Sequence, residues 1–180
     1  MLHSAVLAFV LLHAAPLATF EQEPTLKEPL FKVASVFGKS QADATSYLTK
    51  QFGSKPEWYE SEDDDGKPLF PCHIGPQKPF PITWKTLQVA ANSAKTVTLI
   101  SLMVYGNPSW KSVLTMVGLD PKGVKASPEK LPDWRTSRGE SGLRLSGIKG
   151  VDKDVAVTYI SDPKGAALGE VISVLTLVKK

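Results

Sequence analysis

The sequence predicts an α+β domain, with a mostly antiparallel sheet of about five strands and two helices packed on it. Two observations predict this class. One window, residues 38–53, combines a helix start signal, an apolar stripe and a helix stop signal. Most of the chain after that window consists of short apolar or alternating runs separated by turns, which is typical of strands. With 180 residues, of which 42% are hydrophobic, the chain can fill one core.

The first helix is expected over residues 41–52. Ser40 is a favourable N-cap, because its hydroxyl can accept a hydrogen bond from the backbone N–H of Asp43. Gly53 can adopt the left-handed conformation that ends a helix. The apolar side chains that share one face of this helix are Ala44, Tyr47, Leu48 and Phe52. We therefore expect this face to pack on the sheet.

The N-terminus has the pattern of a secretory signal peptide, expected over residues 1–20 and followed by a flexible leader over residues 21–29. The apolar run is shorter than the ~20 residues that a bilayer span needs, so a cleaved signal is favoured over a membrane anchor. The run lacks a preceding Lys or Arg, which leaves a buried N-terminal helix or strand as the alternative. The signal peptide predicts an extracellular or periplasmic location with no stable membrane anchor.

A single globular domain is expected over residues 30–180, entered through a short strand or extended segment at 30–37. Six prolines and an acidic run mark residues 54–81 as a long irregular loop. Prolines are tolerated at sheet edges, so this loop has room for one edge strand, at Trp58–Tyr59 or at Leu69–Phe70.

A hairpin is expected over residues 82–91 and 96–105, followed by a helix over 109–117. The Asn-Pro pair at 107–108 suits the N-cap and the first position of that helix. Residues 120–142, with three prolines, are expected to form a loop. Strands over 143–148, 154–161 and 170–179 are expected to finish the chain.

The start and stop signals of the first helix also resemble those of a known protein family. The residues that carry it are Gly38, Ser40, Asp43, Ala44, Leu48, Gly53 and Pro56. In this arrangement the helix resembles the opening of the small outer-membrane assembly lipoproteins and of the related β-lactamase-inhibitor-protein-like α+β domains. The lipid-bearing cysteine of those lipoproteins is absent, and the resemblance covers this helix alone. It implies a secreted, non-catalytic interaction domain.

Three patterns with a chemical interpretation are incomplete. Cys72 and His73 are adjacent, which is the wrong geometry for a thiol and its base, and the single cysteine excludes an internal disulfide. The acidic run at 61–66 lacks the leading Asp and the bidentate Glu of a calcium loop. Residues 139–142 lack the Gly-x-Ser-x-Gly spacing of a nucleophile elbow. We therefore assign no catalytic residue, metal site or cofactor.

One segment has the composition of an interface. Trp134 lies in a polar, basic stretch, and tryptophan and arginine are among the residues enriched in binding hot spots. Guanidinium groups can also bind carboxylates or phosphates through two hydrogen bonds. The predicted site for another protein or an anionic ligand consists of Trp134, Arg135, Arg138 and Arg144. In the alternative, Trp134 is buried in the core and its neighbours only solvate the rim.

These observations favour a secreted or periplasmic, non-enzymatic binding domain. A net charge of +3 is too small for the dense basic face that nucleic-acid binding requires. The alternative is a small extracellular hydrolase that uses carboxylates such as Asp133, Glu140 or Asp63. That alternative requires two carboxylates in one pocket, which a sequence does not reveal.

Overall fold

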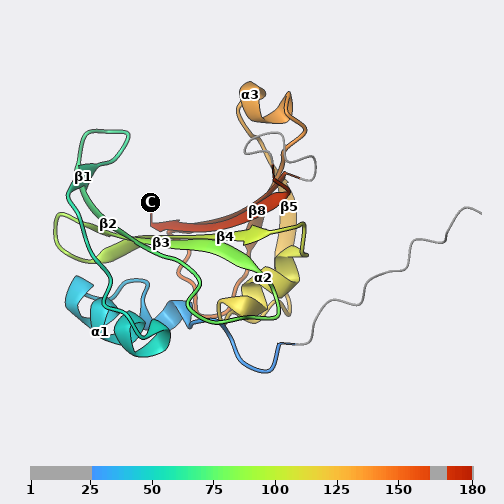
Figure 1. The fold of residues 1–180 in the computed structure, drawn as a ribbon. Coiled ribbons are helices and arrows are strands. Elements are labelled where there is room, and N and C mark those ends of the chain that lie inside the picture. The colour runs from blue at the N-terminus through green and yellow to red at the C-terminus, as the bar shows by residue number, and fades with distance from the viewer. Residues whose placement is uncertain (1–25, 163–169, 180) are drawn as a thin grey trace, which may run out of the picture.

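The structure is a computed structural model that describes residues 26–162 and 170–179. The expected signal peptide over 1–20 and the leader residues 21–25 lie outside the described residues. An eight-stranded antiparallel sheet dominates, in the order β1-β2-β3-β4-β8-β7-β6-β5 (Figure 1). The strands are β1 (Ser61–Glu62), β2 (Pro68–Ile74), β3 (Trp84–Asn92), β4 (Val97–Tyr105), β5 (Lys125–Glu129), β6 (Ser141–Ser146), β7 (Val155–Asp162) and β8 (Ile172–Lys179).

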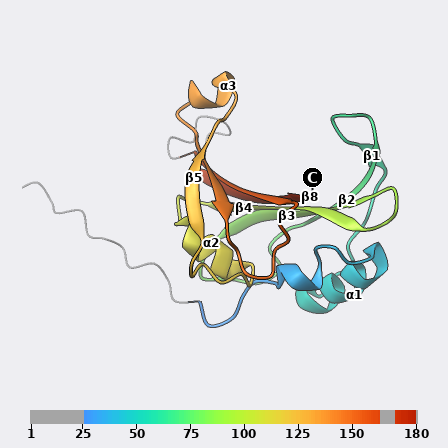
Figure 2. The same ribbon diagram turned by 180° about the vertical axis from the view of Figure 1, so that it is seen from behind.

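Four helical elements accompany the sheet in the described part of the chain: η1 (Val33–Ser35), α1 (Gln41–Phe52), α2 (Trp110–Met116) and α3 (Asp133–Thr136). The predicted α+β class and the antiparallel sheet are confirmed, but five strands and two helices were too few. In both views η1, α1 and α2 lie on one side of the sheet (Figures 1 and 2). On the other side, α3 and the β1–β2 turn rise at opposite ends.

The first helix forms as its sequence predicts. The Ser40 hydroxyl accepts a hydrogen bond of 3.1 Å from the backbone N–H of Asp43, and Gly53 ends the helix with φ of 79°. The side chains that α1 buries against the sheet are Ala44, Leu48 and Phe52. The helix is therefore held both by its local signals and by its apolar face.

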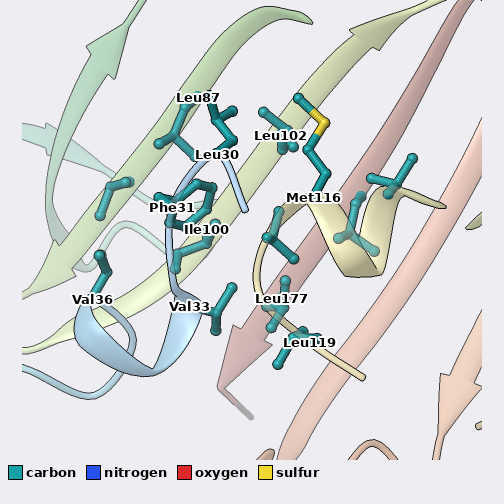
Figure 3. Close-up of a cluster of buried hydrophobic side chains, with 14 of the residues drawn as sticks. Leu30, Phe31, Val33, Val36, Leu87, Ile100, Leu102, Met116, Leu119 and Leu177 are labelled. Atoms are coloured by element: carbon teal, nitrogen blue, oxygen red, sulfur yellow. The ribbon is translucent and has the colours of Figure 1, made fainter. Parts of the chain in front are cut away.

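The segment before α1 belongs to the same layer, although it is not the strand or extended segment that we expected at residues 30–37. It forms the 3₁₀ turn η1 and is tied to the end of α2 by backbone hydrogen bonds from Leu30 to Met116 (2.7 Å) and from Val33 to Val117 (3.0 Å). Figure 3 shows Phe31 of this segment against Ile100 of the sheet. Its apolar side chains thus fill the space between α1 and α2.

The proline-rich region over 54–81 is not one long irregular loop, because it contains β1 and the seven-residue strand β2. Leu69–Phe70, one of the two positions considered for an edge strand, lies within β2, but the edge strand itself is β1. Pro71 lies inside β2 and pairs with Ala90 of β3. The backbone N–H of Tyr59 donates to the carbonyl of Pro71 on the side away from β3 (3.0 Å), so the nitrogen of Pro71 also faces that outer side. Its missing N–H therefore removes no hydrogen bond from the β2–β3 ladder.

Two further expectations need correction. Part of the expected loop over 120–142 forms the edge strand β5, which tolerates Pro128, and the short helix α3. The N-cap of α2 is Ser109 instead of Asn107, because the Ser109 hydroxyl accepts a hydrogen bond from the backbone N–H of Ser112 (3.2 Å). Asn107 lies outside the helix, with its Oδ1 3.5 Å from the hydroxyl of Ser173.

The sheet face opposite α1 and α2 carries no helix in the described residues apart from α3 at one end. We call it the open face. Strand alternation places half-buried apolar and hydroxyl side chains there. Those on the central strands are Leu99, Ser101, Met103, Ala156, Thr158, Ile160, Val174, Thr176 and Val178. The open face is therefore a surface of apolar and hydroxyl-bearing side chains that extends to α3.

Candidate functional site

A hollow of about 250 Å³ lies where the open face meets α3; we call it the α3 hollow. Strands β4, β7 and β8 provide its floor, and α3 with the turn after it provides its wall. Its lining residues are Met103, Trp134, Arg135, Arg138, Glu140, Ile160, Asp162, Ile172 and Val174. Three of the four predicted site residues thus come together beside an apolar floor.

Local geometry holds the wall in place. Pro132 precedes α3, and its carbonyl accepts hydrogen bonds from the backbone N–H groups of Arg135 (2.9 Å) and Thr136 (3.2 Å). Gly139 ends the following turn with φ of 83°, a conformation that favours glycine. The side chain of Trp134 projects from this short helix and is 53% exposed. The alternative of a core tryptophan is therefore wrong.

Two guanidinium groups accompany the Trp134 ring. The Cζ atom of Arg135 lies 4.8 Å from the ring centroid, and that of Arg138 lies 5.2 Å from it, within the range of cation–π attraction. Arg135 also donates to Glu140, with Nη1 2.8 Å from Oε2. Arg138 is exposed and has no ion pair in the described part of the chain. It is thus the wall's available positive charge.

Glu140 is the unusual polar residue of this hollow. Its side chain is only 3% exposed, and Oε1 has no hydrogen-bond partner among the described residues, whereas Oε2 accepts from Arg135. Asp162, at the end of β7, is also buried and lines the same hollow. Asp133 and Asp63, the other acids considered for hydrolysis, are exposed and do not line it.

Arg144, the fourth predicted site residue, lies elsewhere. It is on β6, and two hydrogen bonds join it to Glu129 of β5, from Nε to Oε2 (2.6 Å) and from Nη2 to Oε1 (2.9 Å). This contact raises the pKa of Arg144 above its usual value. Arg144 also lines a different hollow, beside the β6–β7 connection. The pair joins the two strands and leaves Arg144 outside the α3 hollow.

The Cys72–His73 pair and the acidic run at 61–66 both lie in surroundings that give them a structural role. Cys72 is buried on β2, and burial raises the pKa of its thiol to about 12, which disfavours the nucleophilic thiolate. His73 beside it is exposed, with its Nε2 2.8 Å from the hydroxyl of Tyr59. Asp63 stabilises the acidic turn, since its Oδ1 accepts from the backbone N–H groups of Asp65 (3.0 Å) and Lys67 (2.8 Å).

The floor of the α3 hollow contains residues that the sequence analysis did not assign to a site, among them Met103, Ile160 and Val174. Their shared signal is that all three lie at outward positions of predicted strands. A sequence does not reveal which strands are neighbours in the sheet, so the outward positions alone do not show that these three residues lie close together. The antiparallel register does, because it pairs Met103 with Val174 and Val174 with Ile160.

A scan against protein-family models found no match, and searches of curated proteins and of solved structures found none either. The resemblance of α1 to the outer-membrane assembly lipoproteins therefore stays a prediction that rests on that helix. No helix within residues 26–162 and 170–179 is both long and apolar enough to cross a membrane.

Proposed function

We propose that this protein is an exported, non-enzymatic binding domain and that the α3 hollow is its binding site. The observation that carries the proposal is Trp134, which is 53% exposed at the rim of the hollow and has two guanidinium groups close to its ring. Exposing a tryptophan has a free-energy cost that burial against a partner recovers. Tryptophan and arginine are also enriched among the few residues that contribute most of the binding energy of protein interfaces.

The chemistry of the hollow indicates an acidic segment of another protein as the ligand. Arg138 has no acidic partner in the described residues and can bind a carboxylate through two hydrogen bonds. Beside it, Met103, Ile160 and Val174 offer apolar contacts. A carboxylate next to an apolar side chain would satisfy both parts of the site.

A pair of blocked tetrapeptides tests this ligand class: one contains Asp-Phe between glycines and the other contains Asn-Phe. We expect the Asp-Phe peptide to bind more tightly, and Arg138→Ala to abolish the difference, because Arg138 is the one positively charged residue of the hollow without an ion pair among the described residues. Trp134→Ala is expected to weaken binding of both peptides by about thirtyfold, the effect of a hot-spot residue. NMR titration measures each dissociation constant.

Thermal melts and a matched variant control that experiment. The melting temperatures of Trp134→Ala and Arg138→Ala should stay close to that of the unmodified protein, because both side chains are exposed. Lys149→Ala removes an exposed charge from the β6–β7 connection and should leave peptide binding unchanged. Folded Trp134 and Arg138 variants with unaltered affinities would reject the site. An unmodified protein that binds neither peptide would reject the ligand class.

Hydrolysis remains the second candidate, because Glu140 and Asp162 are two buried carboxylates that line one hollow. Acid–base hydrolysis needs one carboxyl group to donate a proton and another to accept one or to attack. Binding is favoured because Arg135 already occupies one oxygen of Glu140. Turnover of a glycoside or ester substrate that Asp162→Asn abolishes, in a folded variant, would favour hydrolysis instead.

Export has its own test. We expect the leader to be removed at a bond within residues 14–23, where the apolar run ends and polar sequence begins. Intact-mass measurement of the protein from the periplasm or the medium should show a mature chain that starts in this interval. Recovery of the full-length chain with Met1 in the cytosol would contradict both the cleavage and the location.

A further inference from the structure

A line of polar side chains crosses the strands on the open face; we call it the polar row. The antiparallel register pairs its members one after another, from Thr158 to Thr176, Ser101, Gln88 and His73. Strands β7, β8, β4, β3 and β2 contribute one member each. Residues directly opposite each other in paired strands point to the same face of a sheet, so these side chains form one line. None of them lines the α3 hollow.

Apolar side chains border the polar row on both sides. The border toward the α3 hollow consists of Met103, Val174 and Ile160, and the other border consists of Leu99, Val178 and Ala156. The row and its borders thus contain no carboxylate, ammonium or guanidinium group. A sheet face in water is usually polar, whereas the centre of a binding surface is depleted of charged residues. This composition indicates that a ligand covers the open face.

The middle of the polar row has unused hydrogen-bonding capacity. The hydroxyls of Ser101 and Thr176 lie 3.4 Å apart, which is long for a hydrogen bond between hydroxyl groups. The side chains of Gln88 and Thr158 make no hydrogen bond within the described residues. All four side chains are half-buried, so a ligand on the open face can reach them. Hydroxyl and amide groups both donate and accept hydrogen bonds, so the row suits a ligand whose groups do the same, as sugar hydroxyls do.

The spacing of the strands sets the repeat of the polar row. Its members belong to neighbouring strands, so they recur about every 4.8 Å. A pyranose unit in an extended, β-1,4-linked chain advances by nearly the same distance. The helix α3 and the β1–β2 turn rise at opposite ends of the open face, so they limit the length of a ligand that lies between them (Figures 1 and 2).

We propose that the polar row binds an uncharged oligosaccharide of extended, β-1,4-linked pyranose units. Sugar hydroxyls form hydrogen bonds with the hydroxyl and amide groups of the row, and the C–H groups of the rings contact the apolar borders. The charge of such a ligand matches the row and its borders, because neither side buries an ion without a partner. This site is separate from the proposed peptide site in the α3 hollow, and neither proposal depends on the other.

Cellopentaose and maltopentaose are the probes, because both consist of glucose units and only the β-linked chain of cellopentaose is extended. We expect isothermal titration calorimetry to show about tenfold tighter binding of cellopentaose, since the coiled chain aligns fewer hydroxyls with the row. Cellobiose should bind more weakly than cellopentaose, because it is too short to cover the row. Equal affinities for the two longer sugars, or no binding of cellopentaose, would overturn the proposal.

Thr176→Val removes one hydroxyl from the middle of the row and keeps a β-branched side chain of the same shape. We expect it to bind cellopentaose about tenfold more weakly, the effect of one hydrogen bond. Thr115→Val makes the same substitution on α2, on the other side of the sheet, and should leave the affinity unchanged.

Ser101→Ala is a second variant within the row, and it takes the place of Thr176→Val if that variant does not fold. A folded row variant that binds cellopentaose as tightly as the unmodified protein would overturn the proposal. A neutral peptide of Gly-Ser repeats tests the other occupant. If this peptide binds, cellopentaose does not, and Thr176→Val weakens the peptide, the row belongs to a polypeptide and the sugar is rejected.

Discussion

Leu48→Asp is expected to unfold the domain. Leu48 is fully buried on the face of α1 that packs against the sheet, in the same apolar cluster as Leu87 and Ile100. A carboxylate at this position would be buried without a partner and would also leave the space of the leucine side chain unfilled. We expect a loss of more than ~4 kcal/mol in the free energy of unfolding, which is a large part of the stability of a domain of this size.

Ser46→Asp is the matched control, because Ser46 lies two positions away on the exposed side of the same helix. Its substitution should change the free energy of unfolding by about 0.5 kcal/mol or less. Circular dichroism during urea titration measures both variants. Equal stabilities for the two would show that the apolar face of α1 does not hold the domain together.

Arg135→Ala is expected to cost about 3 kcal/mol of stability, although Arg135 belongs to a short surface helix. The reason is its partner. Glu140 is 3% exposed, and Arg135 provides the one hydrogen bond that the structure shows to its carboxylate. Removal of Arg135 leaves both oxygens of a buried carboxylate unpaired, which costs more than the loss of an exposed ion pair.

Arg138→Ala controls for the aromatic contact, since Arg138 lies over the same Trp134 ring but has no carboxylate partner among the described residues. It should lower stability by less than about 1 kcal/mol. The double variant Arg135→Ala/Glu140→Gln should regain part of the loss, because the uncompensated charge is gone. Equal denaturation midpoints for Arg135→Ala and Arg138→Ala would contradict the role assigned to the Arg135–Glu140 pair.

Elements with strong local signals were predictable. The bounds of α1 agree with the expected residues 41–52, because Ser40 and Gly53 fix its ends through backbone chemistry that involves neighbouring residues alone. The strands β3, β4, β6, β7 and β8 lie within about two residues of their expected positions. Alternation of side chains is a property of each strand, so it can be recognised before the strand finds its neighbours.

The strands with prolines were not predictable in this way. Proline is unfavourable inside a sheet but is tolerated where its nitrogen faces away from a neighbouring strand. The nitrogen of Pro71 faces away from β3, and Pro128 lies on β5, the strand at the other edge of the sheet. The sequence contains the prolines but not the order of the strands, so β5 was expected to be a loop and β2 was considered only as one of two short edge-strand positions, at Leu69–Phe70.

The proposed binding site was also predictable only in part. Trp134, Arg135 and Arg138 lie within one short segment, and their composition alone indicated a contact surface. The sequence by itself thus determined α1, most strands and the wall of the α3 hollow. Only the tertiary structure decided its floor and the exclusion of Arg144, because strand pairing joins residues that are distant in the chain and Glu129 binds that guanidinium group.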